Sequence, residues 1–536
     1  MTTSRESLVA TRDLVRFMLR RDRVKIPLWA GGISLGMLYA VSALPTVYST
    51  PEERQVRAKL MDSPAATMMS GPGYGLDNYT LGAIITNEMV LWLAVPAAMM
   101  SIFLIVRHTR AEEETGRSEL VRSAVVGRHA ATTAALIVAA LANLAVAVLT
   151  TLAMLSGGLS AVDSLAVGAG IGLTGLVFAG IATVTVQLTE HARAASSLAM
   201  AMVGAAFLLR AVGDAAQPGG NLLSWFSPLA WIQQTRPYVD LRWWPLLLSL
   251  GVLACSVAVG YRLSVRRDVG AGLLPPRLGR AEASPALATP FALAARQQRS
   301  GLIGWSIGLF VFALATGSLS DSVTDAVAEN PEMAEIFNAN GQEPTDAFYT
   351  SMALFFALMI SAFAVTSVLR LKAEERNGHA EAVLATAVSR NRWYGAWLGF
   401  TALASAFLLA VSGLGLGLGG LSGAAGIEIV GQLVVGSLAF LPAVLVVGGL
   451  AAALVGIRPG VAAGAWILVA YAVIFGMFGP LLDLPAMFAD VSPFGHTTIM
   501  PLSSLRVLPL AVLVVVAGAL VAAGRVTFRR RDLELN

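Results

Sequence analysis

The sequence Glu-Glu-Glu-Thr-Gly-Arg-Ser-Glu-Leu-Val at residues 112–121 decides the fold, because residues 374–383 read Glu-Glu-Arg-Asn-Gly-His-Ala-Glu-Ala-Val. Seven pairs of identical residues are separated by 262 positions, from Glu112 and Glu374 at one end to Arg128 and Arg390 at the other. Chance does not plausibly produce this agreement. The chain is therefore predicted to be a duplication that carries one acidic loop in each copy.

The sequence around the loops has the composition of a membrane protein. Of the 536 residues, 56 % are hydrophobic and 13 % are charged, and the mean hydropathy is +0.70. Soluble chains have about 45–50 % apolar and about 25 % charged residues, so these values disfavour a cytosolic enzyme. Runs of about 20 apolar residues are long enough to cross a hydrocarbon layer of about 30 Å. Twelve such runs are predicted, at 27–47, 86–106, 131–155, 162–188, 195–213, 244–264, 301–320, 351–369, 396–419, 428–454, 462–482 and 508–525.

The distribution of charge predicts the orientation of these spans. Basic clusters at 107–128, 262–280, 370–392 and 525–531 all fall on one side if both termini lie in the cytoplasm. The longer loops on the other side, about 48–85, 214–243, 321–350 and 483–507, carry few basic residues. Residues 1–26 are predicted to form a basic amphipathic helix on the inner membrane face.

Other landmarks recur at similar spacing, including Tyr79-Thr80 with Tyr349-Thr350 and Ser227-Pro228 with Ser492-Pro493. Arg266-Arg267-Asp268 likewise recurs as Arg530-Arg531-Asp532. We predict an all-α integral membrane fold with twelve transmembrane helices in two parallel six-helix repeats. The predicted parts are a first half at 1–264, a cytoplasmic linker with a surface helix at 265–300, and a second half at 301–536.

The acidic loops are the leading candidates for a functional site. Each has carboxylates around a glycine and then an apolar stripe on one face of a short helix. An ordinary solvated helix that caps the second span of each half is one interpretation. Agreement of the charged positions in both copies favours the other, a docking surface for a cytoplasmic partner.

Ionisable groups inside the membrane are the second set of candidates. Arg210 lies near the end of the fifth run with Asp214 one turn further on, so the two form either a local ion pair or part of a substrate path. Aromatic residues and methionines are candidates to line an apolar passage, although lipid-facing or packing roles fit them equally well. The predicted path residues are Met89, Trp92, Phe103, Phe207, Arg210, Phe355, Phe356, Met359, Trp466 and Phe475.

Several kinds of chemistry are unsupported by the sequence. None of the three lysines, Lys25, Lys59 and Lys372, is followed by Ser or Thr, so the chain has no Walker A motif and is predicted not to be an ATPase. No cofactor or metal site is expected, since Cys255 is the single cysteine and no catalytic set is apparent. The G-x-G-x-x-G match at 415–420 follows no strand and predicts close helix packing instead.

Residues 105–120, Ile-Val-Arg-His-Thr-Arg-Ala-Glu-Glu-Glu-Thr-Gly-Arg-Ser-Glu-Leu, resemble the cytoplasmic loop of actinobacterial permeases for the export of polyketide antibiotics, the tetronasin-resistance type. The likeness extends over essentially the whole chain. It implies an ABC-2 type permease in the bacterial plasma membrane that exports hydrophobic drugs or antibiotics. It also implies two copies of a separate cytoplasmic ATPase, which bind the ATP and Mg²⁺, and no nucleic-acid partner.

By the same resemblance, the loops at 107–128 and 370–390 are the coupling helices that seat in each ATPase. The coupling residues implied are Glu112, Glu113, Gly116, Glu119, Glu374, Glu375, Gly378 and Glu381. The alternative is a proton-driven secondary drug transporter of the major facilitator type, which also has twelve helices. Its loop after the second span usually follows a basic G-x-x-x-D-R-x-G-R pattern, whereas the loop here is acidic.

Overall fold

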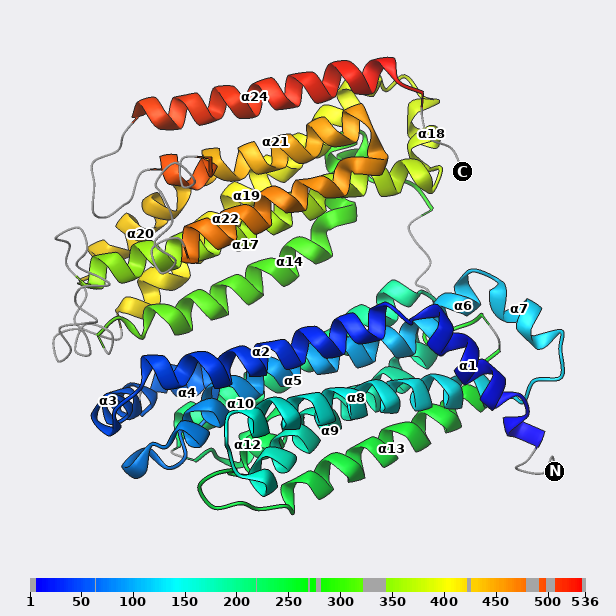
Figure 1. The fold of residues 1–536 in the computed structure, drawn as a ribbon. Coiled ribbons are helices and arrows are strands. Elements are labelled where there is room, and N and C mark those ends of the chain that lie inside the picture. The colour runs from blue at the N-terminus through cyan, green and yellow to red at the C-terminus, as the bar shows by residue number, and fades with distance from the viewer. Residues whose placement is uncertain are drawn as a thin grey trace. The chain divides into compact units, whose positions relative to one another are not determined.

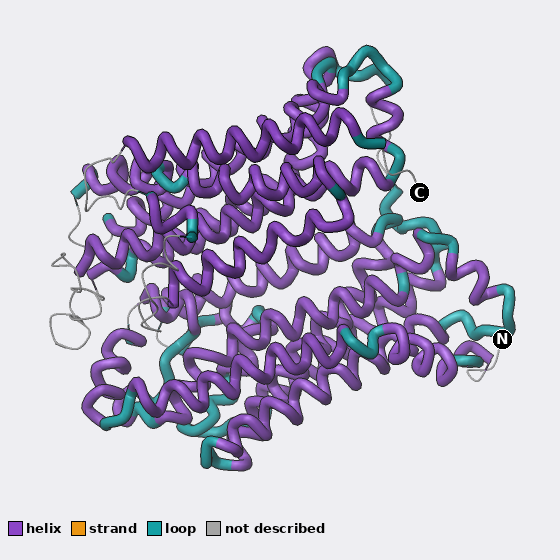
Figure 2. Tube along the Cα trace, turned by 45° about the horizontal axis from the view of Figure 1, so that its top comes forward, coloured by secondary structure: helices purple, strands orange, loops and turns teal. Residues whose placement is uncertain are grey.

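The computed structural model describes residues 6–62, 64–217, 219–268, 270–275, 281–321, 344–421, 426–478, 491–497 and 507–532. Within these ranges the chain consists of helices and connecting loops, with no strand (Figure 2). Twelve of the described helices are long and apolar enough to cross a membrane. The prediction of an all-α membrane protein with twelve spans is therefore confirmed. The chain divides into unit 1, Met1–Gly279, and unit 2, Arg280–Asn536, with six of these helices in each.

In unit 1 the six long helices run alongside one another (Figure 1). They are α2 (Lys25–Val47), α5 (Leu81–His108), α8 (Ala130–Ser156), α9 (Ala161–Leu188), α10 (Ala192–Ala216) and α13 (Pro245–Val265). Short helices lie at both ends of this bundle: η1 (Glu6–Leu8), α1 (Thr11–Arg21), α3 (Pro51–Met61), α4 (Pro64–Ser70), η2 (Leu76–Asn78), α6 (Arg110–Glu114), α7 (Arg117–Arg122), α11 (Leu222–Trp225) and α12 (Pro228–Gln233). The end with α1, α6 and α7 is called the acidic-loop end below, and α3 lies at the opposite end.

Unit 2 is built from α14 (Pro290–Gly317), α17 (Pro344–Arg376), α19 (Arg390–Gly420), α20 (Glu428–Leu438), α21 (Leu441–Ile457), α22 (Ala465–Phe478) and α24 (Val507–Arg530). The short elements are η3 (Pro285–Leu287), α18 (His379–Leu384), η4 (Pro459–Gly464) and η5 (Pro493–His496). The span expected at 428–454 is interrupted between α20 and α21. Pro442 is the second residue of α21, and its lack of an N–H suits the first turn of a new helix.

The outer faces of both bundles are apolar, as expected for helices in lipid. On α8 the exposed side chains include Leu141, Leu144, Val148 and Leu152, which follow one face of the helix. A soluble protein rarely leaves such a long apolar surface uncovered. The inner faces pack closely, with α5 and α9 buried in unit 1 and α17 and α21 buried in unit 2.

Glycines in α19 permit close helix contact. A Cβ at Gly419 would lie 2.2 Å from the Leu314 carbonyl oxygen of α14, and one at Gly413 would lie 2.5 Å from the Leu433 carbonyl oxygen of α20. Any larger residue would force the helices apart. The glycine pattern at 415–420 thus lies within a helix-packing surface, as its sequence context predicts.

The two units begin differently. In unit 1, α1 packs Met18 into the core and is separated from α2 by a short break at Asp22. In unit 2, the segment expected to form a separate surface helix is part of the continuous helix α14. Asp22 is fully buried and bonded to His108 at 2.6 Å, a contact that fixes the break in unit 1. Unit 2 has the neutral Gln298 at the matching position, and it accepts a bond from Ser367 within an unbroken helix.

Candidate functional site

The repeated glycines of the acidic loops are required by the backbone. Gly116 has φ +72° between α6 and α7, and Gly378 has φ +75° immediately before α18. A side chain at either position would meet no atom within 4 Å, so the constraint is conformational rather than spatial. The matched glycines therefore form the turn that starts each short helix.

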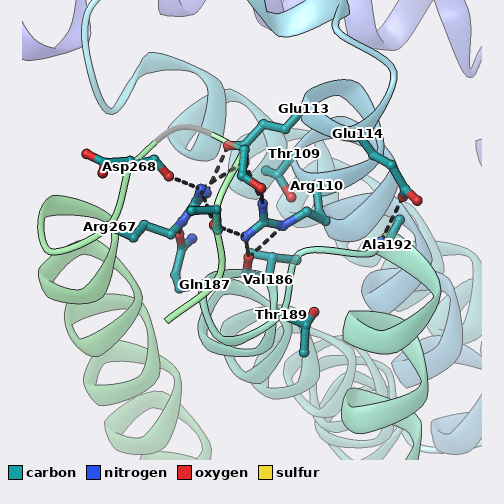
Figure 3. Close-up of polar contacts among 12 residues, drawn as sticks. Thr109, Arg110, Glu113, Glu114, Val186, Gln187, Thr189, Ala192, Arg267 and Asp268 are labelled. Carbon is teal, nitrogen blue, oxygen red and sulfur yellow. Dashed lines mark hydrogen bonds and ion pairs between the residues drawn. The ribbon is translucent and has the colours of Figure 1, made fainter. Parts of the chain in front are cut away.

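In unit 1, Glu113 is held by two arginines (Figure 3). Its carboxylate accepts two bonds of 2.9 Å from the Arg267 guanidinium and one of 3.0 Å from Arg110. Arg267 lies just beyond the end of α13, and the Glu113 side chain is only 9 % exposed. A two-point bond of this kind fixes both partners in orientation as well as in distance.

Unit 2 contains the same pair at the matching positions. Glu375 accepts bonds of 2.5 Å and 2.6 Å from the guanidinium of Arg531, which directly follows α24. The Glu375 residue is 2 % exposed. The two arginines belong to the repeated Arg-Arg-Asp sequences, so both halves of the duplication retain both members of the pair.

A second connection, a hydrogen bond from an arginine, links the C-terminal end of each loop to the same last helix. Arg128 donates to the Val265 carbonyl oxygen at 3.0 Å, and Arg390 donates to the Arg531 carbonyl oxygen at 2.6 Å. Arginines suit these places because free carbonyl groups gather at the C-terminus of a helix and attract positive charge. Each acidic loop is consequently fastened to its last helix at both ends.

A third connection links each loop to the first helix of its unit. Arg21 of α1 forms an ion pair with Glu112. In unit 2, Gln297 of α14 donates to the Glu374 carboxylate at 3.3 Å. The carboxylates of Glu112, Glu113, Glu374 and Glu375 thus all have partners inside their own unit, which is a structural role that the loop sequence alone does not reveal.

Between these two connections to the last helix, several side chains of each loop are exposed. In unit 1, Glu119 is exposed, and Leu120 and Val125 are 77 % and 86 % exposed. In unit 2, the matching exposed residues are Glu381, Ala382 and Ala387. Large apolar side chains are seldom left in solvent without a partner, so the unit 1 segment has the character of a docking surface.

Unit 1 has additional contacts around its loop. The fully buried Arg110 donates to the carbonyl oxygens of Val186, Gly270 and Ala271 at 2.7 to 3.2 Å. Glu114 accepts a 2.9 Å bond from the Ala192 N–H at the start of α10, where a carboxylate interacts favourably with the helix dipole (Figure 3). The loop of unit 1 is therefore also connected to α9 and α10.

Sequence reasoning missed the roles of Arg110, Arg267 and Arg531. A signal for the last two was present, because both recur in the repeated Arg-Arg-Asp landmark and a buried carboxylate needs a cation. Arg110 offered no such signal, since the matching residue of unit 2 is Lys372.

Arg210 lies in a buried polar cluster at the opposite end of unit 1. It bonds to Asp214 at 3.1 Å and to the Thr67 carbonyl oxygen of α4 at 3.2 Å, and its guanidinium lies 5.0 Å from the Phe207 ring. This geometry favours the ion-pair interpretation of Arg210, and the bond to Thr67 also connects α10 to α4.

A second, partly buried ion pair at this end was not singled out from the sequence. Arg57 of α3 binds Glu88 of α5 through two bonds of 2.9 Å. Burial alone would lower the pKa of Arg57, but Glu88 and two tyrosines more than offset this and raise its pKa, so the guanidinium stays charged. The available signal was Glu88 itself, a carboxylate inside an apolar run.

The predicted path residues differ in their exposure within each unit. On α5, Met89, Trp92 and Phe103 follow one face of the helix, and Trp92 and Phe103 are 47 % and 40 % exposed. Phe356 is instead fully buried against Phe312 in the core of unit 2.

The remaining path residues are divided in the same way. Phe355 and Met359 are half-buried beside that core. Phe475 stacks on Tyr471 at 4.2 Å, and Trp466 is 41 % exposed. A passage therefore remains a proposal for the exposed members of the set. Among the residues that the structure describes, no cluster of three or more His, Cys, Asp or Glu is placed to hold a metal ion.

Twelve apolar helices, with an acidic loop at one end of each bundle, define a multi-pass membrane protein. Its kind is shown by comparison. The family model described as "Multidrug efflux system permease Rv1217c, C-terminal domain" matches residues 15–263 and 287–529. The chain is also 37 % identical over 532 residues to the multidrug efflux system permease protein Rv1217c of Mycobacterium tuberculosis, covering 98 % of this chain and 95 % of that protein. The chain belongs to this family of multidrug efflux permeases.

Proposed function

We propose that the protein is the membrane subunit of an ATP-driven ABC exporter for hydrophobic drugs or antibiotics, of the polyketide-antibiotic exporter type. ATP and Mg²⁺ bind to a separate ATPase, of which one copy docks on the acidic loop of each unit. Both loops lie in the cytoplasm with both chain termini, and the protein resides in the bacterial plasma membrane. The absence of a Walker A motif from the sequence and the family of efflux permeases both support this proposal.

The proposal rests on the side chains of each loop that are exposed between its two connections to the last helix. The exposed side chains are Glu119, Leu120 and Val125 in unit 1 and Glu381, Ala382 and Ala387 in unit 2, with Glu119 and Glu381 at matching positions. An anchored but uncovered helix is suited to enter a groove of a partner, because little conformational entropy is lost when it binds. We assign docking to Glu119, Glu381 and the neighbouring apolar residues, and positioning to the buried acids.

Transport then follows from movement of these anchored loops. ATP binds the closed ATPase dimer better than the open one, so it shifts the equilibrium towards closure and moves both loops. The six-helix halves switch between two states as rigid bodies, and a passage along α5, α10, α17 and α22 opens outward. Trp92 and Phe103 present apolar surface of the kind that a hydrophobic drug would contact.

The structure offers little support for the proton-driven alternative. A proton-coupled carrier needs a buried carboxylate that changes protonation during the cycle. The buried carboxylates Asp22, Glu88 and Asp214 in the described part of unit 1 are each paired with an arginine. Each of them therefore already has a charge partner within its own unit.

Transport by inverted membrane vesicles tests the proposal. The permease is expressed with a candidate ABC ATPase, sought first among the genes adjacent to its own, and ATP-dependent uptake of a hydrophobic dye, ethidium, is followed. We expect uptake to require both subunits and to fall with the double variant Glu119→Lys, Glu381→Lys, together with co-purification of the ATPase. Dye transport by the permease alone, driven by a proton gradient in liposomes, would overturn the proposal.

A further inference from the structure

We infer that Glu113 with Arg267 and Glu375 with Arg531 join each acidic loop to the last helix of its unit, so that the loop and that helix move as one part. The inference rests on the proposed function, because the force is taken to come from a docked ATPase. It assigns the buried acids a transmission role that is separate from docking.

The position of the last helices gives the pairs their importance. In α13 and in α24 only 17 % of the apolar window is buried, the lowest share among the spans. Helix α13 packs mainly on α9, and α24 packs mainly on α21. Helices α5 and α17, which lead into the loops, therefore pack little against the last helices α13 and α24. The ion pairs supply a direct connection.

The geometry of the two ion pairs suits the transmission of a displacement from the loop to the last helix. Each pair has two parallel bonds between a carboxylate and a guanidinium, both largely removed from solvent. Arg128 and Arg390 fasten the other end of the loop to the same helix end. A displacement of the exposed segment between these points is passed to the last helix without first bending the loop.

The duplication supplies an independent second observation. The loops differ at Glu114 and Arg376, at Thr115 and Asn377, and at Arg117 and His379. The ion pair is nevertheless formed by the same residue types at matching positions in both units. Docking alone does not require this, because the paired acids are buried and not offered to a partner.

Unit 2 offers the cleaner test, since Arg110 has no arginine counterpart there. The variants are Arg531→Glu, Glu375→Arg and the exchange of both residues. Arg530→Glu is the matched control, because it makes the same change of charge one residue away at an exposed position. The exchanged double variant keeps both charges and should restore the pair.

The first measurement uses the permease alone in nanodiscs and needs no ATPase. Hydrogen exchange is followed in peptides that cover residues 373–390 and 520–532. We expect faster exchange in both peptides with Arg531→Glu, no change with Arg530→Glu, and recovery in the exchanged variant. Unchanged exchange with Arg531→Glu would overturn the inference even if the proposed function is correct.

The second measurement uses the complex with the neighbouring ATPase. We expect Arg531→Glu to retain ATPase binding while ethidium transported per ATP hydrolysed falls by about tenfold, with recovery in the exchanged variant. If Arg531→Glu instead abolishes ATPase binding, the pair serves docking and the inference is wrong. If the wild-type permease binds no ATPase, the proposed function fails, whereas the hydrogen-exchange result still decides whether the loop and helix are joined.

Discussion

The two acidic loops agree in their buried contacts and differ in their exposed surface. Both use a glutamate and an arginine to fasten the loop to the last helix. The exposed segment carries Leu120 and Val125 in unit 1 but Ala382 and Ala387 in unit 2, and only unit 1 has the buried Arg110. The difference indicates that the internal connection is common to both halves, whereas the surface offered to a partner is specific to each.

The largest expected effect concerns Arg110. Replacement by Ala removes the donors to the carbonyl groups of Val186, Gly270 and Ala271 and weakens the neutralisation of Glu113. We therefore expect a loss of about 3 kcal/mol in the free energy of unfolding. Lys372→Ala at the matching position should change it by less than about 0.5 kcal/mol. Thermal unfolding in nanodiscs, followed by tryptophan fluorescence, compares the two. Equal shifts would show that the loops are supported alike.

Docking strength should differ between the loops. Leu120→Asp places a charge where an apolar side chain meets the proposed partner, and we expect ATPase affinity at that site to fall about tenfold, or about 1.4 kcal/mol. Ala382→Asp should have a smaller effect, because less apolar contact is lost. Titration of a labelled ATPase onto nanodisc-bound permease measures both. A larger effect from Ala382→Asp would reverse the proposed ranking of the two surfaces.

Much of the fold could be read from the sequence because hydropathy and charge act over whole helices. The apolar runs coincide with the twelve spans, and the repeat at 112–121 and 374–383 identifies both loops. The continuity of α14 could not be read in this way. It depends on the neutral Gln298 at the position where unit 1 has a buried, ion-paired Asp22, and that contact joins residues far apart in sequence.

The site was predictable in position but not in detail. Charge conservation between the copies pointed to the loops, yet it could not separate a carboxylate that faces a partner from one that faces an internal arginine. Glu119 and Glu113 look alike in sequence, and only the fold brings Arg267 to Glu113. The same limit applies to Phe356 and Trp92, whose opposite exposures depend on which helices surround α17 and α5.

The turn glycines should respond equally in the two loops. Gly116→Ala and Gly378→Ala each force a side chain into the left-handed region, at a cost of about 1–2 kcal/mol in local stability. Because no atom lies within 4 Å of either new Cβ, we expect no further steric penalty and no difference between the units. Hydrogen exchange of the loop peptides measures the local effect. A marked inequality would mean that one loop relaxes its turn at little cost.

The smallest effect is expected from the arginines of α1. Arg12, Arg16, Arg20 and Arg23 are exposed, and none of them forms an ion pair among the described residues. Helix α1 ends at Arg21 and the span α2 begins at Lys25, so we expect these guanidinium groups to lie near lipid headgroups.

Arg16→Gln should therefore reduce the stabilisation that anionic phosphatidylglycerol gives, by at most about 1 kcal/mol, and added salt should reduce the difference. Unit 2 has alanines at the positions that match Arg12 and Arg16, so Arg296→Gln in α14 tests the same contact where less basic charge surrounds it. We expect a weaker dependence on anionic lipid for Arg296→Gln, measured by unfolding in nanodiscs with and without phosphatidylglycerol. An equal dependence would mean that α1 and α14 interact alike with anionic lipid, and that the two units differ only in their acidic loops.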